Sequence, residues 1–165
     1  MPMVQQSWSR WRQAHPDTRV LSVETGYSRN YAPDGAYRAY FAAPEPAFPV
    51  AWRDRSRAAK AVVFGMEAPG GAKAWPLALF AATPLVQDRV GLQDVVLIGA
   101  ASPPGVRAYD ATGHRFSRAG GDTLVAEDGV WQITEAALLG PQGLSLPRVP
   151  GHLAYWFAWA AFHPE

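Results

Sequence analysis

Short apolar runs separated by turn residues dominate the chain from residue 61 to residue 135. The intervening segments APGG, SPPG, DATG, AGG and EDG place glycine or proline where a tight turn needs special backbone angles. Short strands at this spacing are typical of an antiparallel sheet that curls into a sandwich or an open barrel. Pro76 indicates an edge strand, because proline cannot donate to a sheet ladder. The expected strands cover residues 18–25, 61–66, 72–80, 94–100, 105–110, 114–117, 122–127 and 130–135.

Both ends of the chain carry aromatic residues at helical spacing. WSRWRQAHPD near the start places Trp8 and Trp11 on one helical face, and WFAWAAFHPE at the end repeats its skeleton of Trp, Trp, His-Pro and an acid. A proline disfavours helical geometry in the residue before it, so each helix should stop near its His-Pro pair. The expected helices cover residues 3–14 and 152–162. The last one is apolar all round, so it must be covered on several sides.

These patterns predict a mainly β fold, at the margin of α+β, with short helices at both chain ends. A length of 165 residues suggests one domain, residues 1–165, with a β core at about 18–148. Residues 26–50 are rich in proline, tyrosine and phenylalanine. Because disordered segments are poor in aromatic residues, we expect an ordered loop there, pinned by its rings.

Composition excludes several classes of function. Fifteen basic and fourteen acidic residues give a net charge of +1, which argues against nucleic acid as a partner. Without cysteine the chain has no disulfide, no thiolate nucleophile and no cysteine-ligated cofactor, and we expect no cofactor of another kind. The longest apolar run, Leu153 to Phe162, is too short to span a bilayer, so membrane contact would be at most indirect, through a partner. The first residues also lack the apolar core of a secretory signal.

The chain is poor in charge, at 18%, and rich in aromatic residues, at 12%. Interface centres are depleted in charge and enriched in aromatic side chains, so a protein partner is one explanation. A well-filled core and the stacking of a ligand are the others. The candidate interface residues are Trp8, Trp11, Tyr155, Trp156, Phe157, Trp159 and Phe162.

A ligand site is the alternative, at the loop from Thr25 to Tyr40, with Arg29, Asn30 and Tyr31 as polar contacts. Arg29 could bind a carboxylate or phosphate, or it could pair with a nearby acid or carbonyl and hold the loop.

Signs of catalysis are weak. If the two terminal helices met, His15 and His163 could offer two metal ligands, but two make a weak site, and both rings could instead cap their helices. There is no Gly-x-Ser-x-Gly elbow and no phosphate-binding glycine fingerprint. An enzyme is therefore the less favoured interpretation.

A set of ordered segments resembles one known family across nearly the whole chain. SWSRWRQAHPDTRVLSVETGYSRNY, GGAKAWPL, GLQDVVLIG, AYDATGHRF, DGVWQITEAALLGP and YWFAWAAFHPE are similar to the bacterial domain-of-unknown-function 3179 family. The resemblance implies an envelope protein, periplasmic or otherwise extracytoplasmic, and it implies no reaction. We therefore expect a non-catalytic binding or structural module that docks as an accessory subunit on a larger assembly. The alternative is a ligand binder or enzyme that uses the loop from Thr25 to Tyr40.

Overall fold

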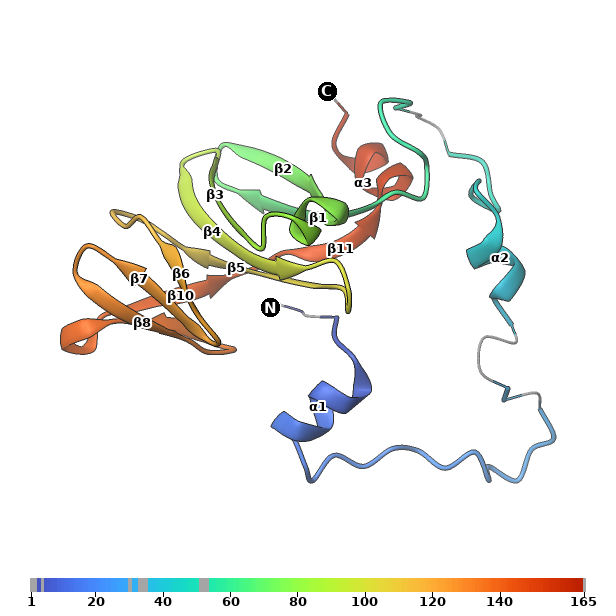
Figure 1. Cartoon of the computed structure of the whole chain (residues 1–165). Helices are drawn as coiled ribbons and strands as arrows, with labels where there is room; N and C mark the ends of the chain where they lie inside the picture. The colour runs from blue at the N-terminus through green and yellow to red at the C-terminus, as the bar shows by residue number, and fades with distance from the viewer. Residues whose placement is uncertain (1–2, 4, 30, 33–35, 51–53, 165) are drawn as a thin grey trace.

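The computed structural model describes residues 3, 5–29, 31–32, 36–50 and 54–164, and its described strands form two antiparallel sheets (Figure 1). The smaller sheet has the strand order β11-β1-β2, with β2 at its edge. The edge position that Pro76 predicts is therefore confirmed. Its members are β1 (Val62–Ala68), β2 (Gly71–Pro76) and β11 (His152–Tyr155).

The larger sheet has eight strands in the order β3-β4-β5-β10-β9-β8-β7-β6, and it curls over itself (Figure 1). This architecture confirms the mainly β fold with a curled antiparallel sheet. Its strands are β3 (Leu85–Val90), β4 (Gln93–Ala100), β5 (Gly105–Asp110), β6 (Ser117–Gly120), β7 (Thr123–Ala126), β8 (Gly129–Ile133), β9 (Ala137–Leu139) and β10 (Ser145–Val149).

The run VVLI in β4 is apolar at every position because both faces of this strand are covered. Val95 and Leu97 pack with Phe64 of β1 in a first core cluster between the two sheets. Val96 and Ile98 point the other way, into a second cluster with rings from the curled half of the larger sheet. A strand buried on both faces loses the usual apolar and polar alternation.

Three short helices and two 3-10 turns are the other elements among the residues that the structure describes. Each α-helix lies outside the two sheets (Figure 1). The helices are α1 (Trp8–Ala14), α2 (Arg38–Ala42) and α3 (Trp156–Phe162), and the 3-10 turns are η1 (Leu77–Ala81) and η2 (Pro141–Gly143).

Both terminal helices are shorter than predicted. Ser7 caps α1 by accepting from the backbone N–H of Arg10, so the helix begins at Trp8 rather than at residue 3. At the other end, residues 152–155 form β11, because they pair with β1 in antiparallel register. Pairing with a neighbouring strand overrides the helical spacing in this stretch.

The strand predicted at residues 18–25 is wrong. This segment has no strand partner, and Val20, Leu21 and Val23 are exposed. An alternating pattern forms a strand only where another strand supplies the hydrogen bonds. The described β core therefore begins at Val62 rather than at residue 18, and the extent of the domain over residues 1–165 stays a prediction.

Two other boundaries moved, and four strands were missed. The 72–80 run ends as a strand at Pro76 and continues as η1, while the 114–117 run becomes strand only from Ser117. The strands that were missed are β3, β9, β10 and β11. They are short or interrupted by polar residues and proline, so their own patterns are weak.

Candidate functional site

Two arginines and one glutamate form the most connected charged cluster among the described residues. Arg107 lies on β5 and Arg148 on the adjacent antiparallel strand β10, while Glu135 lies in the turn between β8 and β9. The arginine side chains are only 11% and 7% exposed, whereas that of Glu135 is 52% exposed. We call these three residues the arginine clip.

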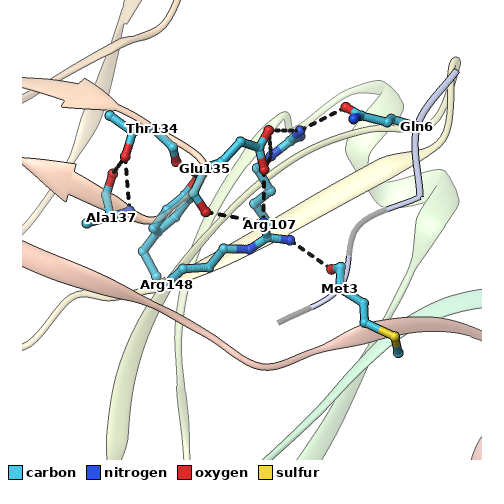
Figure 2. Close-up of polar contacts among 8 residues, drawn as sticks. Met3, Gln6, Arg107, Thr134, Glu135, Ala137 and Arg148 are labelled. Atoms are coloured by element: carbon cyan, nitrogen blue, oxygen red, sulfur yellow. Dashed lines mark hydrogen bonds and ion pairs between the residues drawn. The ribbon is translucent and has the colours of Figure 1, made fainter. Parts of the chain in front are cut away.

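Glu135 receives hydrogen bonds from both guanidinium groups (Figure 2). Nε of Arg107 donates to the two carboxylate oxygens at 3.0 and 3.1 Å, and Nη2 of Arg107 also donates to Oε1. Nη1 of Arg148 donates to Oε2 at 2.9 Å. The carboxylate thus joins the turn between β8 and β9 to the strands β5 and β10.

The hydrogen bonds from Arg107 keep the pKa of Glu135 below its usual value, although partial burial acts in the opposite direction. The positive charges of Arg107, Arg148 and Arg10 add to this lowering. Glu135 is therefore ionised near neutral pH and is not suited to act as a general acid. The clip nevertheless contains two cations and one anion, so one positive charge is left over in a largely buried place.

The clip also binds the beginning of the chain. Nη2 of Arg148 donates to the backbone carbonyl of Met3 at 2.8 Å, and Nη2 of Arg107 donates to Oε1 of Gln6 at 3.3 Å (Figure 2). These contacts join residues more than a hundred positions apart. They fasten the segment just before α1 to the larger sheet.

A cavity of about 530 Å³ lies beside the clip. Its volume is within the range typical of small-molecule sites. Charged and polar side chains from the start of the chain and from strands and turns of the larger sheet contribute to its wall. They include Gln6, Arg10, Arg107, Arg118, Asp122 and Glu135.

The first part of the chain, which the clip holds at Met3 and Gln6, carries many exposed aromatic side chains. We call the described residues from Met3 to Lys60 the N-terminal arm. None of these described residues is buried, and the arm runs outside the two sheets (Figure 1). Its exposed rings are Trp8, Trp11, Tyr27, Tyr31, Tyr37, Phe41 and Phe48.

The rings of the arm mostly contact one another rather than the core. Phe41 lies against Tyr37 and Tyr40, and Phe48 meets Phe157 of α3 edge-on, with ring centroids 5.9 Å apart. Lys60 donates to the carbonyl of Tyr40. The rings do make contacts within the 26–50 loop, but they do not bury it.

The structure separates the seven predicted interface residues into two groups. Trp159 is 6% exposed and packs within the chain, so its indole is not available as a surface anchor here. The other side chains are accessible at least in part: Trp8 and Trp11 on α1 are 49% and 36% exposed, Phe162 is 84% exposed, and Tyr155, Trp156 and Phe157 are half-buried.

The predicted ligand residues Arg29 and Tyr31 do not line the cavity beside the clip. The hydroxyls of Thr25 and Tyr31 are hydrogen-bonded to each other at 2.8 Å, and Arg29 is exposed. Asn30 lies outside the described residues. A ligand role for this loop therefore stays a prediction.

The two histidines proposed as metal ligands are not brought together. The ring of His15 lies against Trp11 of α1 and that of His163 stacks on Trp159 of α3, and the two helices lie on separate parts of the molecule (Figure 1). Across the part of the chain that the structure describes, no three histidine, aspartate or glutamate side chains are grouped for a metal ion. Within the same residues, no helix has the length and apolar character needed to cross a bilayer.

Sequence reasoning missed the arginine clip. Arg107 precedes Glu135 by 28 positions, and no local motif connects them. The available signal was Arg107 inside the strand predicted at residues 105–110, where a charge facing the core needs a partner, whereas Arg148 lies in β10, which the pattern did not predict.

Comparison with known families decides the relationship that the segments suggest. The family described as "Protein of unknown function (DUF3179)" matches residues 1–165, the full length of the chain. The chain belongs to the DUF3179 family. No curated protein and no solved structure matches this DUF3179 chain. Its function has to be argued from its own residues.

Proposed function

We propose that this DUF3179 chain is a non-catalytic binding module that docks on another protein, as an accessory subunit of a larger assembly of the bacterial envelope. One observation carries the proposal, namely that no described residue before Val63 is buried although this part of the chain is rich in aromatic rings. The envelope location is supported by the family resemblance alone.

The exposure of the arm is unusual in energetic terms. Each 100 Å² of apolar surface left in water forgoes about 2.5 kcal/mol of burial free energy. Tyr27, Tyr37, Phe41 and Phe48 are between 57% and 74% exposed, and all lie within one short stretch. Tyr37 and Phe41 contact each other, and exposed apolar side chains that lie together on a folded protein commonly mark an interaction site. Phe162 of α3 adds a further ring, 84% exposed, outside the arm.

The arginine clip supports the same function, because it determines where the arm leaves the sheet. The hydrogen bonds to Met3 and Gln6 fix the chain just before α1. A fixed starting point reduces the conformational entropy that the arm loses on binding.

Replacing the arm rings tests the proposal. The W8S/W11S/Y27S/Y37S/F41S/F48S variant is expected to keep the circular dichroism and the unfolding midpoint of the wild type, because none of these rings is buried. Its retention of co-purifying proteins from the native source is expected to fall at least about tenfold.

The matched control is L92S/V130S, which removes apolar side chains that are 74% and 61% exposed on the β core. This control should retain partners as the wild type does. Equal retention by the arm variant and the wild type would refute the docking function.

A second candidate function, the binding of a small anion, is favoured by the cavity beside the clip. Arg10, Arg107 and Arg118 line it together with only two acids, Asp122 and Glu135. A carboxylate or phosphate group placed there would balance the positive charge left over in the clip.

Calorimetric titration with citrate and with inorganic phosphate tests this second candidate. The R10Q/R118Q variant should weaken binding at least about tenfold, while R12Q, whose side chain is exposed and outside the cavity wall, should leave it unchanged. Absence of binding heat with both anions would remove the candidate.

A further inference from the structure

The helices α1 and α3 are two copies of one local structure. Their caps share backbone angles: Ser7 and Tyr155 precede the helices at φ −67°, ψ 148° and φ −74°, ψ 146°. The histidines that end them have φ −136°, ψ 71° and φ −128°, ψ 68°. In each, the histidine ring lies on the second tryptophan, with ring centroids 4.1 and 3.9 Å apart. The corresponding residues are Trp8 and Trp156, Trp11 and Trp159, His15 and His163, and Pro16 and Pro164.

In α3 this structure is docked on a specific place in β1. A Cβ added at Gly65 would lie 2.2 Å from the ring of Trp159, so only glycine leaves room for the indole. Nε2 of His163 lies 3.4 Å from Oε1 of Glu67, two residues further along β1. Residues i and i+2 of a strand share a face. We call this pair, a glycine followed two residues later by a carboxylate, the glycine seat.

α1 has no glycine seat on the described part of its own chain. None of its residues is buried, and Trp8 and Trp11 are 49% and 36% exposed. Among the described residues, four glycines lie so close to an aromatic ring that an added Cβ would collide with it. Each of these rings belongs to the β core or to α3, and none belongs to α1. These pairs are Gly65 with Trp159, Gly99 with Phe80, Gly140 with Trp131, and Gly151 with Phe64.

We propose that α1 docks on a β-strand of another protein that offers a glycine seat, with a glycine under Trp11 and a carboxylate beside His15. This inference rests on the proposed docking function and specifies the chemistry of the partner. α1 carries Arg10 and Arg12 at the positions of Ala158 and Ala160 in α3. Arg10 lines the cavity beside the clip, whereas the side chain of Arg12 is exposed, so the partner strand is flanked by a further acidic side chain that faces Arg12.

A second copy of this chain does not fit as the partner. Gly65 in that copy is already covered by Trp159 of its own α3. In addition, Ala160 is 1% exposed, so the docked helix has no space for a side chain as long as Arg12 at that position. The seat for α1 thus resembles β1 in its glycine and differs from it in having room and negative charge beside the helix.

Grafting the uncharged residues of α1 onto α3 tests whether the α1 structure fits a glycine seat. The F157S/A161Q/F162A variant converts these positions and keeps Ala158 and Ala160. It is expected to fold, and adding G65A should lower its urea midpoint as much as G65A lowers that of the wild type. A folded graft that is insensitive to G65A would overturn the inference. If the triple variant fails to fold, A161Q/F162A, which keeps the Phe48 contact of Phe157, gives the same comparison.

The A160R variant tests whether a second copy could be the partner. It is expected to lower the urea midpoint and to make the chain insensitive to G65A, because the helix leaves its seat. An unchanged midpoint would show that a seat like that of β1 accepts α1, and would overturn the exclusion of a second copy.

Photo-crosslinking locates the partner strand directly. With benzoylphenylalanine in place of Trp11 in the native source, the crosslinked peptide should contain a glycine followed by an acid within a few residues. Crosslinks to another copy of this chain, to a segment without glycine, or to nothing would overturn the inference. If the arm variant loses its partners but position 11 does not crosslink, docking stands and the α1 inference fails. If the arm variant loses nothing, the proposed function itself fails.

Discussion

Glu135 shows how one side chain can hold three parts of the chain together. It accepts from Arg107 and Arg148, and these two arginines in turn donate to Gln6 and the carbonyl of Met3. Nε of Arg148 is buried without a partner among the described residues. Removing the carboxylate charge would leave two nearly buried guanidinium groups without their counterion, which is the costly way to break such a pair.

We expect Glu135→Gln to lower the free energy of unfolding by about 1–3 kcal/mol, the usual penalty for leaving buried donors poorly satisfied. Urea denaturation monitored by circular dichroism measures this free energy of unfolding. Glu127→Gln is the control, because Glu127 is exposed. A change no larger than that of the control would contradict the structural role of the clip.

The pH dependence of stability has a defined sign at the same residue. Hydrogen bonds from Arg107 lower the pKa of Glu135 in the folded state relative to its value of 4.5 in an unfolded chain. The folded state thus gains stability above the unfolded pKa, and this gain disappears as the pH falls through the lowered pKa. Between pH 5 and pH 3 in urea titrations, Glu135→Gln should lose less stability than the wild type. A slope equal to that of the wild type would argue against this linkage.

At the scale of single elements, α1 and α3 show that a tryptophan at the same position of a helix can be buried in one place and exposed in another. Both helices end in a histidine whose ring lies against a tryptophan. Only α3 has Gly65 beneath its tryptophan, so Trp159 is buried while Trp11 remains accessible. The difference lies in the surface that each helix meets and in the residues beside the tryptophans, which are Arg10 and Arg12 in α1 and Ala158 and Ala160 in α3.

Truncating the two tryptophans should therefore have unequal effects. Trp159→Ala is expected to lower the free energy of unfolding by about 3–5 kcal/mol, as is usual for a large aromatic side chain removed from a core. Trp11→Ala should change it by about 0.5 kcal/mol or less, as surface substitutions do. Urea unfolding of the two variants in parallel measures both values. Equal losses would mean that α1 is packed as tightly as α3.

At the scale of the whole molecule, a well-packed β core stands beside an arm in which no described residue is buried. Two core clusters fill the space between the sheets and inside the curl of the larger sheet. The described arm residues take part in neither cluster. Segments with few buried contacts open with little free energy, whereas core strands open only with global unfolding.

Limited trypsin digestion should reveal this division. Arg19, Arg29 and Arg38 in the arm are expected to be cleaved first, and further cleavage at the exposed Arg55 and Arg57 should leave a resistant fragment that begins close to Val62. Mass spectrometry of a time course identifies the cleavage sites. Cleavage within the strands at a similar rate would contradict the division.

Much of the β core could be predicted from the sequence because its strands are bounded by glycine and proline turns. The runs at 94–100 and 105–110 correspond closely to β4 and β5. Strands β9 and β10 could not be found in this way. β9 has three residues, and β10 contains Pro147. Their strand geometry depends on pairing with neighbours that are distant in the sequence.

The candidate site was less predictable than the fold. The aromatic residues of α1 and α3 could be selected from their helical spacing, but spacing does not distinguish a packed ring from an exposed one. Trp159 and Trp11 look alike until Gly65 is placed beneath one of them. The arginine clip was not predictable, since its members converge only when β5, β10 and the turn after β8 come together.

The sequence by itself determined what depends on neighbouring residues: the turns, most strands of the core, the two His-Pro helix ends and membership of a family. The tertiary structure alone decided what depends on distant residues, which is the pairing of β11 with β1, the seat of Trp159 and the clip that fastens the arm. Local backbone preferences act over a few positions along the chain, whereas burial and charge pairing depend on which surfaces meet in space.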